Sequence, residues 1–281
     1  MKKITTIIIA AFAVFVLAGC SKQGENDDLI GGDSGPVMNN YVSAYIRPVK
    51  LFLPDNVSNY QDEENIYTQV MFFTPPSTLP FNDGEAWSRE MVDKFEYENI
   101  VRPGYMFEQN DDEFPVIPML VSRYDSLCKA HKDTEYSKKE KHYSGHQFIW
   151  ATYRRMTLDV TSDTQYDAAH PAGTSLADII DIRTNSAKEV IESGYDYKVC
   201  ETMTNYTGTT YELALGHKLE MPLEQFNREY RKLIADNIRL NLKTAPDVTS
   251  THRFTVTYRD EDGRVLTATA APVTLQGKGA E

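Results

Sequence analysis

Hydrophobic and polar residues alternate along much of the chain, and this period of two predicts β-strands. The clearest alternation covers residues 147–161 and fits a half-buried strand or a bent hairpin. Its apolar face would carry Phe148, Trp150, Met156, Leu158 and Val160. Shorter stretches predict strands over 41–53, 66–74, 195–203, 211–215 and 238–242. The chain would end in a β-hairpin around the turn Asp260-Glu261-Asp262-Gly263.

Three other stretches have the spacing of an amphipathic helix. The first follows Asn82 and Glu85, which fit a capping box, and carries Trp87, Met91 and Phe95 on one face. The second begins near Pro118, and its apolar face would hold Leu120, Tyr124, Leu127 and Cys128. The third begins at Pro222 and would carry Leu223, Phe226, Tyr230, Leu233 and Ile234.

These patterns amount to about eight strands and three helices. They predict a mainly β fold, a β-sandwich with about three peripheral helices, and an α+β domain is the alternative. Pro48 cannot donate to a ladder, so it marks a sheet edge or a bulge in the first strand. The globular body would span residues 37–281, either as one unit or as two subdomains divided near residue 145.

The first twenty residues follow a different pattern. Lys2 and Lys3 precede an apolar run over residues 4–18, and Leu17-Ala18-Gly19-Cys20 closes the segment. This is the three-part shape of a secretory signal, and the apolar run is too short for an ordinary membrane span. The segment resembles the signal of a bacterial lipoprotein. That resemblance implies removal of residues 1–19 and acylation of Cys20, and an uncleaved N-terminal anchor is the alternative.

Residues 20–36 are polar and rich in glycine, which predicts a flexible tether between the lipid and the body. Ser21, directly after the cysteine, resembles lipoproteins that are sorted to the outer membrane. Residues 163–178 and the last hairpin are similar to stretches of uncharacterised Bacteroidota lipoproteins. The resemblance implies an outer-membrane protein anchored by lipid, facing either the cell surface or the periplasm. It implies no activity.

The chain is acidic, with 41 Asp and Glu against 29 Lys and Arg and a net charge of −12. This balance argues against a nucleic-acid partner, because such proteins bind phosphates with Lys and Arg. Once Cys20 is acylated, Cys128 and Cys200 remain. They form either a disulfide or two buried free thiols.

Candidate catalytic patterns all have simpler explanations. Gly32-Asp33-Ser34-Gly35-Pro36 resembles the nucleophile segment of a serine protease, but it lies in the tether with no preceding histidine. His131, His142 and His146 lie among lysines, which disfavours a metal site. Asp260 and Asp262 lack the further ligands of a calcium loop. We therefore expect no catalytic residue, metal or cofactor.

The 17 tyrosines are the most suggestive feature, because tyrosine suits both binding surfaces and strands. Trp87, Trp150 and Tyr153 are the candidate ligand contacts. The sequence favours a non-catalytic module that binds a glycan or an envelope protein. An exported hydrolase, with a site assembled from distant residues, and a structural component of a surface assembly are the alternatives.

Overall fold

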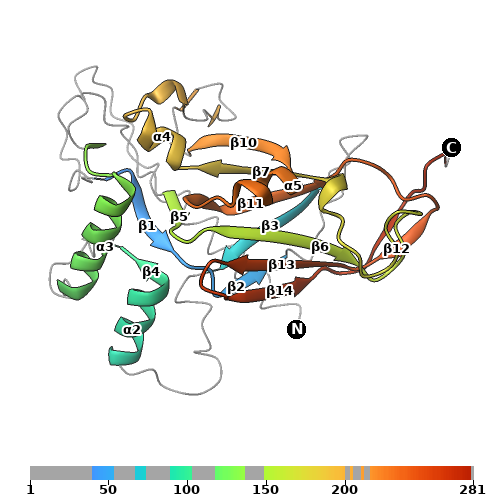
Figure 1. The fold of residues 1–281 in the computed structure, drawn as a ribbon, viewed down its shortest axis with the longest axis horizontal. Helices are drawn as coiled ribbons and strands as arrows, with labels where there is room; N and C mark the ends of the chain where they lie inside the picture. The colour runs from blue at the N-terminus through green and yellow to red at the C-terminus, as the bar shows by residue number, and fades with distance from the viewer. Residues whose placement is uncertain are drawn as a thin grey trace, which may run out of the picture. The chain divides into compact units, whose positions relative to one another are not determined.

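A computed structural model describes residues 40–53, 67–73, 89–102, 118–136, 149–199, 203–204, 210–211 and 216–279 (Figure 1). All of these belong to one compact unit, Pro36–Glu281. The predicted signal, Cys20, the tether, Trp87 and Cys200 lie outside the described residues.

The described part is mainly β, as predicted. Its strands are β1 (Val42–Ile46), β2 (Lys50–Phe52), β3 (Tyr67–Phe73), β4 (Ile100–Val101), β5 (Ile149–Thr152), β6 (Met156–Ser162), β7 (Ile180–Ser186), β8 (Met203–Thr204), β9 (Thr210–Tyr211), β10 (His217–Pro222), β11 (Ile234–Leu242), β12 (Ser250–His252), β13 (Phe254–Asp260), β14 (Val265–Thr269) and β15 (Val273–Leu275). Its α-helices are α2 (Arg89–Asn99), α3 (Pro118–His131), α4 (Lys188–Glu192) and α5 (Leu223–Glu229).

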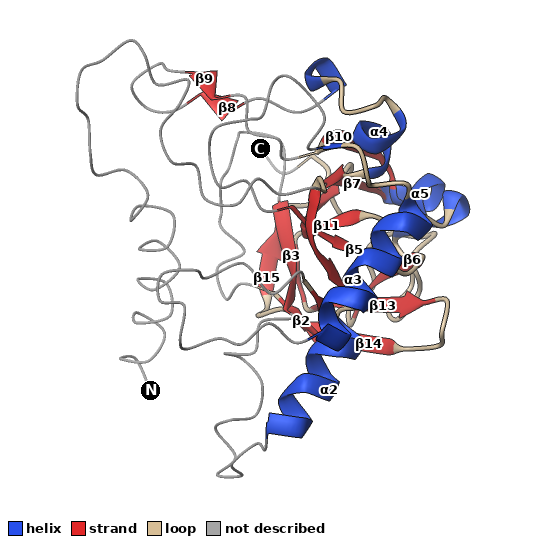
Figure 2. Cartoon of the chain, turned by 90° about the vertical axis from the view of Figure 1, so that its left-hand side faces the viewer, coloured by secondary structure: helices blue, strands red, loops and turns tan. Residues whose placement is uncertain are grey.

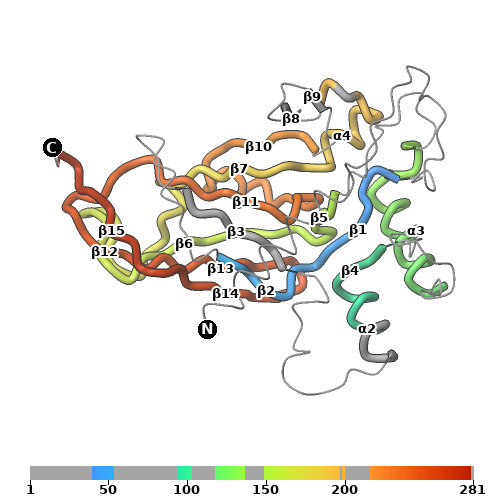
Figure 3. Tube along the Cα trace, turned by 180° about the vertical axis from the view of Figure 1, so that it is seen from behind, coloured from blue at the N-terminus to red at the C-terminus, as the bar shows by residue number. Residues whose placement is uncertain are grey.

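Two sheets dominate the architecture. The larger follows the order β10-β7-β11-β5-β1-β4, and β3 and β2 extend it from a second position along β11. The smaller has the order β14-β13-β6. The large sheet is antiparallel except where β1 pairs with β5 in parallel. β2 lies next to β14, so the edges of the two sheets meet there (Figure 3).

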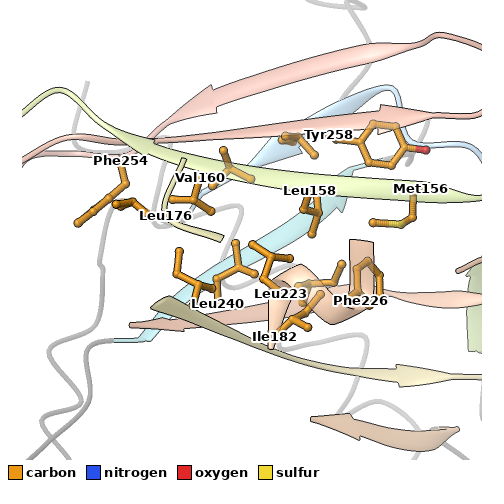
Figure 4. Packing of buried hydrophobic residues seen from close by; sticks show 14 of the residues in the cluster. Met156, Leu158, Val160, Leu176, Ile182, Leu223, Phe226, Leu240, Phe254 and Tyr258 are labelled. Atoms are coloured by element: carbon orange, nitrogen blue, oxygen red, sulfur yellow. The ribbon is translucent and has the colours of Figure 1, made fainter. Parts of the chain in front are cut away.

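The main core fills the space between these sheets, which gives the fold its sandwich character. Burial alternates strictly along β6, β7 and β13, because every second side chain points inward. Figure 4 shows Met156, Leu158 and Val160 of β6 facing Ile182 and Leu240 of the large sheet. Helix α5 closes one end of this core with the buried Leu223 and Phe226.

A second core cluster lies under α3, a helix that packs on β1 and β4 (Figure 1) and next to α2 (Figure 2). It joins Val42 and Tyr45 of β1 to Tyr124 of α3, Ala151 of β5 and Val190 of α4. Both core clusters take residues from either side of position 145. Each cluster therefore combines residues that are far apart in the sequence.

The stretch 147–161 forms two strands in different sheets, so it is neither the single strand nor the hairpin that the sequence left open. β5 joins the large sheet, and β6 joins the small one. The chain bends between them, where Tyr153 N donates to Ile46 O and Met156 N donates to Arg231 O. The bend changes which residues point inward, so Ile149 and Ala151 are buried while Trp150 is half-buried. The prediction that Trp150 shares a face with Met156 was wrong, whereas the alternation within β6 is confirmed.

Two of the three predicted helices begin where their prolines indicate. α3 begins at Pro118 and buries the four predicted residues. α5 follows Pro222 but ends at Glu229, because Tyr230 adopts a left-handed conformation with φ of 48°. Leu233 also has a positive φ, and Ile234 begins β11, so their assignment to the helix was wrong. α2 overlaps the first predicted helix, and its predicted cap lies outside the described residues.

The final hairpin of β13 and β14 is confirmed, as is β3. The single strand predicted over 41–53 is instead divided into β1 and β2, on either side of Pro48. The strand predicted over 195–203 was wrong in its first part. Tyr195 has φ of 64°, and Tyr197–Val199 is a 3-10 turn. β7 and β10 were not predicted, although β7 alternates as clearly as β6.

Candidate functional site

The aromatic residues proposed from the sequence do not form one exposed patch. Trp150 is half-buried and lies on the opposite face of β5 from Ile149 and Ala151, which belong to the second core cluster. Tyr153 belongs to that cluster and is only 5% exposed. Tyr153 is therefore a core residue rather than an exposed contact, and Trp87 lies outside the described residues.

The Tyr153 ring is nevertheless the centre of an arginine–tyrosine cluster. Its hydroxyl donates a hydrogen bond of 2.6 Å to the backbone oxygen of Glu98 in α2. The guanidinium carbons of Arg154 and Arg123 lie 5.1 and 5.8 Å from the ring centroid. Arg123 also lies 5.3 Å from the ring centroid of Tyr97. These are distances at which a cation is attracted to an aromatic ring.

Arg123 differs from its neighbours because no carboxylate neutralises it. It makes no ion pair or hydrogen bond within the described part of the chain, and its Nε is enclosed without an acceptor. Its two Nη groups are not enclosed in this way. Arg154, by contrast, lies 2.9 Å from Asp262 and 4.0 Å from Glu261, and about a third of its side chain is exposed.

Next to this cluster, the buried carboxylate of Asp260 joins Arg47 to the final hairpin. Asp260 accepts from Arg47 Nε at 2.7 Å and from the backbone N–H groups of Asp262 and Arg264. Burial alone would raise the pKa of Asp260, but Arg47 and these donors outweigh it and hold the pKa below its usual value. Arg264 then reaches Asn99 Oδ1 at 2.8 Å and so ties the hairpin to α2.

These contacts also explain the acidic turn that resembles a calcium loop. Both oxygens of Asp260 are occupied in closing the hairpin and binding Arg47. Within the described residues, no three His, Cys, Asp or Glu side chains gather as a metal site would require.

The cluster carries an excess of positive charge, although the chain as a whole is acidic. Burial lowers the pKa of His131 to about 4, and Lys232 and Arg154 add to the effect, which places two cations near it. The cationic members are Arg47, Arg123, Arg154, Arg264 and Lys232, and the carboxylates among them are Asp260, Glu261 and Asp262.

A second polar cluster, around Asp133, serves the fold. Its carboxylate accepts from the backbone N–H groups of Tyr41 and Val42 at 2.8 and 2.9 Å, and from the Tyr195 hydroxyl at 3.0 Å. Asp133 is fully buried, so these bonds replace its lost hydration. Burial raises the pKa of the neighbouring Cys128 thiol to about 12, and a protonated thiol is a poor nucleophile.

Cys128 is a free, buried thiol in the structure. The disulfide was one of two alternatives left open by the sequence, and its other member, Cys200, lies outside the described residues. Cys128 fits the other alternative, a buried thiol that packs as a small hydrophobic side chain.

One serine–histidine contact that the sequence did not suggest lies in the sandwich. Ser162 Oγ is 2.9 Å from His252 Nδ1, and Ser250 Oγ is 2.7 Å from Nε2 of the same ring. His252 is fully buried and Ser162 is 4% exposed. A substrate cannot reach this serine, so the contact joins β6 to β12 and does not form a catalytic pair.

A shallow hollow of about 560 Å³ runs along the outer face of α3. Its lining includes Val121, Ser122, Asp125 and Lys129, and it contains no enclosed polar group that would recognise a ligand. No helix among the described residues is both long enough and apolar enough to cross a membrane.

No protein-family model, curated protein or solved structure matches this chain. Function therefore has to be inferred from the residues themselves. The sequence pointed to Tyr153 but not to Arg123, because the cluster joins α2, α3, the bend after β5 and the final hairpin. Residues so far apart along the chain leave no local pattern; a lone arginine on a helix looks like any solvated charge.

Proposed function

We propose that this chain is an outer-membrane protein, anchored by lipid at Cys20, whose β-rich body is a non-catalytic binding module for a glycan or an envelope protein. The resemblance of residues 1–20 to a lipoprotein signal supports the proposed location at the outer membrane. Arg123 supports the binding role, because it is a cation placed against two tyrosine rings, and no carboxylate in the described ranges pairs with it. Arginine and tyrosine are enriched at the residues that dominate protein interfaces.

The use of the other ionisable groups also favours binding over catalysis. Asp133 and Asp260 bind backbone N–H groups and neighbouring side chains, and His252 is enclosed between two serines. A general acid or base has to reach the substrate, and these groups are buried in contacts that maintain the fold.

One observation favours the alternative of an exported hydrolase. Asp236 lies in β11 where its register with β7 shifts, and burial raises its pKa to about 6. A carboxyl group that titrates near neutrality is suited to general acid–base catalysis. If the chain is a hydrolase of glycans or peptides, Asp236→Asn should abolish the activity.

The third alternative, a structural component of an assembly, predicts an exposed apolar patch or a free sheet edge. The edges at β2 and β14 meet one another. The described edge at β10 carries Lys218, Glu220 and Pro222, and residues of these kinds discourage pairing with a further strand.

A binding screen with the full acylated chain tests the proposal. The purified protein is applied to an array of neutral and acidic glycans, and cross-linking in intact cells identifies envelope proteins that contact it. We expect saturable binding to one of these classes and no turnover of the bound ligand. Release of shortened glycans or peptides by the wild-type chain, lost in Asp236→Asn, would contradict the non-catalytic role.

A further inference from the structure

The guanidinium of Arg123 indicates what kind of ligand group this part of the surface would bind. Buried polar groups are almost always hydrogen-bonded in folded proteins, and charged ones are usually paired. Among the residues that the structure describes, Arg123 has neither an acceptor on its enclosed Nε nor an ion pair. Its Nη groups stay open to an acceptor from outside the chain, because they are neither enclosed nor hydrogen-bonded.

The two tyrosine rings hold the guanidinium ready for such an acceptor. Tyr97 comes from α2 and Tyr153 follows β5, so the rings fix the guanidinium from two separate elements. The Tyr153 hydroxyl is itself fixed by the backbone of Glu98. A side chain held in this way loses little freedom on binding, and this raises affinity for a ligand that fits.

Arg154 places a second cation against the same ring. A guanidinium presents parallel N–H groups that match the two oxygens of a carboxylate. Asp262 and Glu261 partly neutralise Arg154, so Arg123 supplies most of the uncompensated positive charge of the pair. A guanidinium in this position suits a ligand group that carries a carboxylate.

We propose that Arg123 and Arg154 bind the carboxylate of a uronic-acid sugar, which gives the binding module an acidic-glycan specificity. This inference rests on the proposed binding function. The Tyr97 side chain beside the cation is partly exposed, and aromatic side chains of this kind suit contact with a sugar ring. A strongly acidic protein or a highly sulfated glycan fits less well, because the chain has a net charge of −12 and would repel a polyanion.

Calorimetric titration of the full acylated chain in detergent micelles tests this assignment. The probes are galactose and glucose oligosaccharides that carry a single galacturonate or glucuronate residue, with the matching fully neutral oligosaccharides as comparison. We expect the uronates to bind and the neutral sugars to bind at least about tenfold more weakly, which corresponds to one lost charged contact. Raising the salt concentration should weaken uronate binding.

Variants of Arg123 distinguish the contribution of the guanidinium hydrogen bonds from that of the positive charge. Arg123→Gln should reduce uronate affinity about tenfold, and Arg123→Lys should restore part of the loss because the charge remains. Arg154→Gln should have a smaller effect in the same direction. Arg228→Gln is the matched control, because Arg228 is an exposed arginine on α5, 71% accessible, outside the cluster. Circular dichroism of each variant checks that it is folded.

Several outcomes would overturn the assignment. One is uronate binding by Arg123→Gln as strong as that of the wild type; another is equal binding of uronates and neutral sugars. Failure of the wild-type chain to bind any uronate would also refute it, whatever the variants do. If a neutral glycan, an acidic peptide or an envelope protein binds instead, the binding function stands and only the acidic-sugar inference fails. If nothing binds in either screen, both fail.

Discussion

His170 shows how single residues fix a long loop of this protein. It lies in the loop between β6 and β7, is 7% exposed, and has a carboxylate on each side of its ring. Nδ1 is 2.7 Å from Asp167 Oδ1, and Nε2 is 3.0 Å from Asp178 Oδ1. A neutral imidazole can donate from only one nitrogen, so a carboxylate at each nitrogen favours the doubly protonated, charged ring.

The charged ring makes the stability of the loop depend on pH. Burial alone would lower the pKa of His170, but its hydrogen bonds to Asp167 and Asp178 outweigh burial and raise the pKa above its ordinary value. A raised pKa in the folded state stabilises the protein below the unfolded-state value of about 6.5. This contribution is lost as the pH rises through the folded-state pKa of His170.

We therefore predict that His170→Gln lowers the free energy of unfolding by about 1 kcal/mol at pH 5.5 and by less at pH 8.5. Urea unfolding at both pH values measures the difference. Asp178→Asn is the comparison, because it removes one carboxylate and should reduce the pH dependence without removing it. A cost of His170→Gln that is equal at the two pH values would refute the charged ring.

At the scale of elements, the sequence predicted best where one local rule decides the outcome. α3 begins at its proline and buries the face that its spacing indicates, because a helix of 14 residues repeats its pattern several times. β5 has only four residues, and the bend after it is held by Ile46 and Arg231, both distant in sequence. The alternation alone does not show where the chain bends or which sheet each half joins. Trp150 was therefore assigned to the wrong face.

The candidate site was predictable only in part, for the same reason. Tyr153 could be singled out because it lies in an aromatic, alternating stretch. Arg123 carries no signal in the sequence, since its two ring contacts come from α2 and from the residue after β5. The end of α5 was missed because the left-handed conformations of Tyr230 and Leu233 are unusual for residues other than glycine.

Gly216 offers a test of how β10 is joined to the large sheet. Its φ is +101°, and an added Cβ would lie 2.9 Å from the backbone oxygen of Ser186 in β7. Gly216→Ala therefore suffers both backbone strain and a clash with a strand that cannot move freely. We predict a loss of about 2–3 kcal/mol in the free energy of unfolding, measured by urea denaturation.

The matched control is Gly173→Ala. Gly173 has φ of +80°, but nothing lies within 4 Å of the position where its Cβ would be. This variant should lose only about 1 kcal/mol, from backbone strain alone. Equal losses in the two variants would mean that close packing of Gly216 against Ser186 contributes nothing.

At the scale of the whole molecule, Cys20 would carry the lipid anchor, whereas Cys128 would remain an unmodified core residue. Cys20 follows the lipoprotein-like signal, where its sulfur would have to be accessible to an acylating enzyme. Cys128 is 1% exposed, and burial raises its pKa to about 12, so it is a poor acceptor for any modification. An acyl chain contributes about 0.8 kcal/mol per buried methylene, so several chains on Cys20 would hold the body on the membrane.

Metabolic labelling with an alkyne fatty acid tests this division of roles. We predict that the wild-type chain takes up the label and fractionates with the outer membrane. Cys20→Ala should take up none and leave that fraction, whereas Cys128→Ala should remain labelled and membrane-bound. Label retained in Cys20→Ala would refute the anchor, because the acyl group would then be attached elsewhere.

Protease treatment of intact cells, with lysed cells as comparison, shows which side of the outer membrane the body faces. Loss of the body from intact cells would place it at the surface, and protection until lysis would place it in the periplasm.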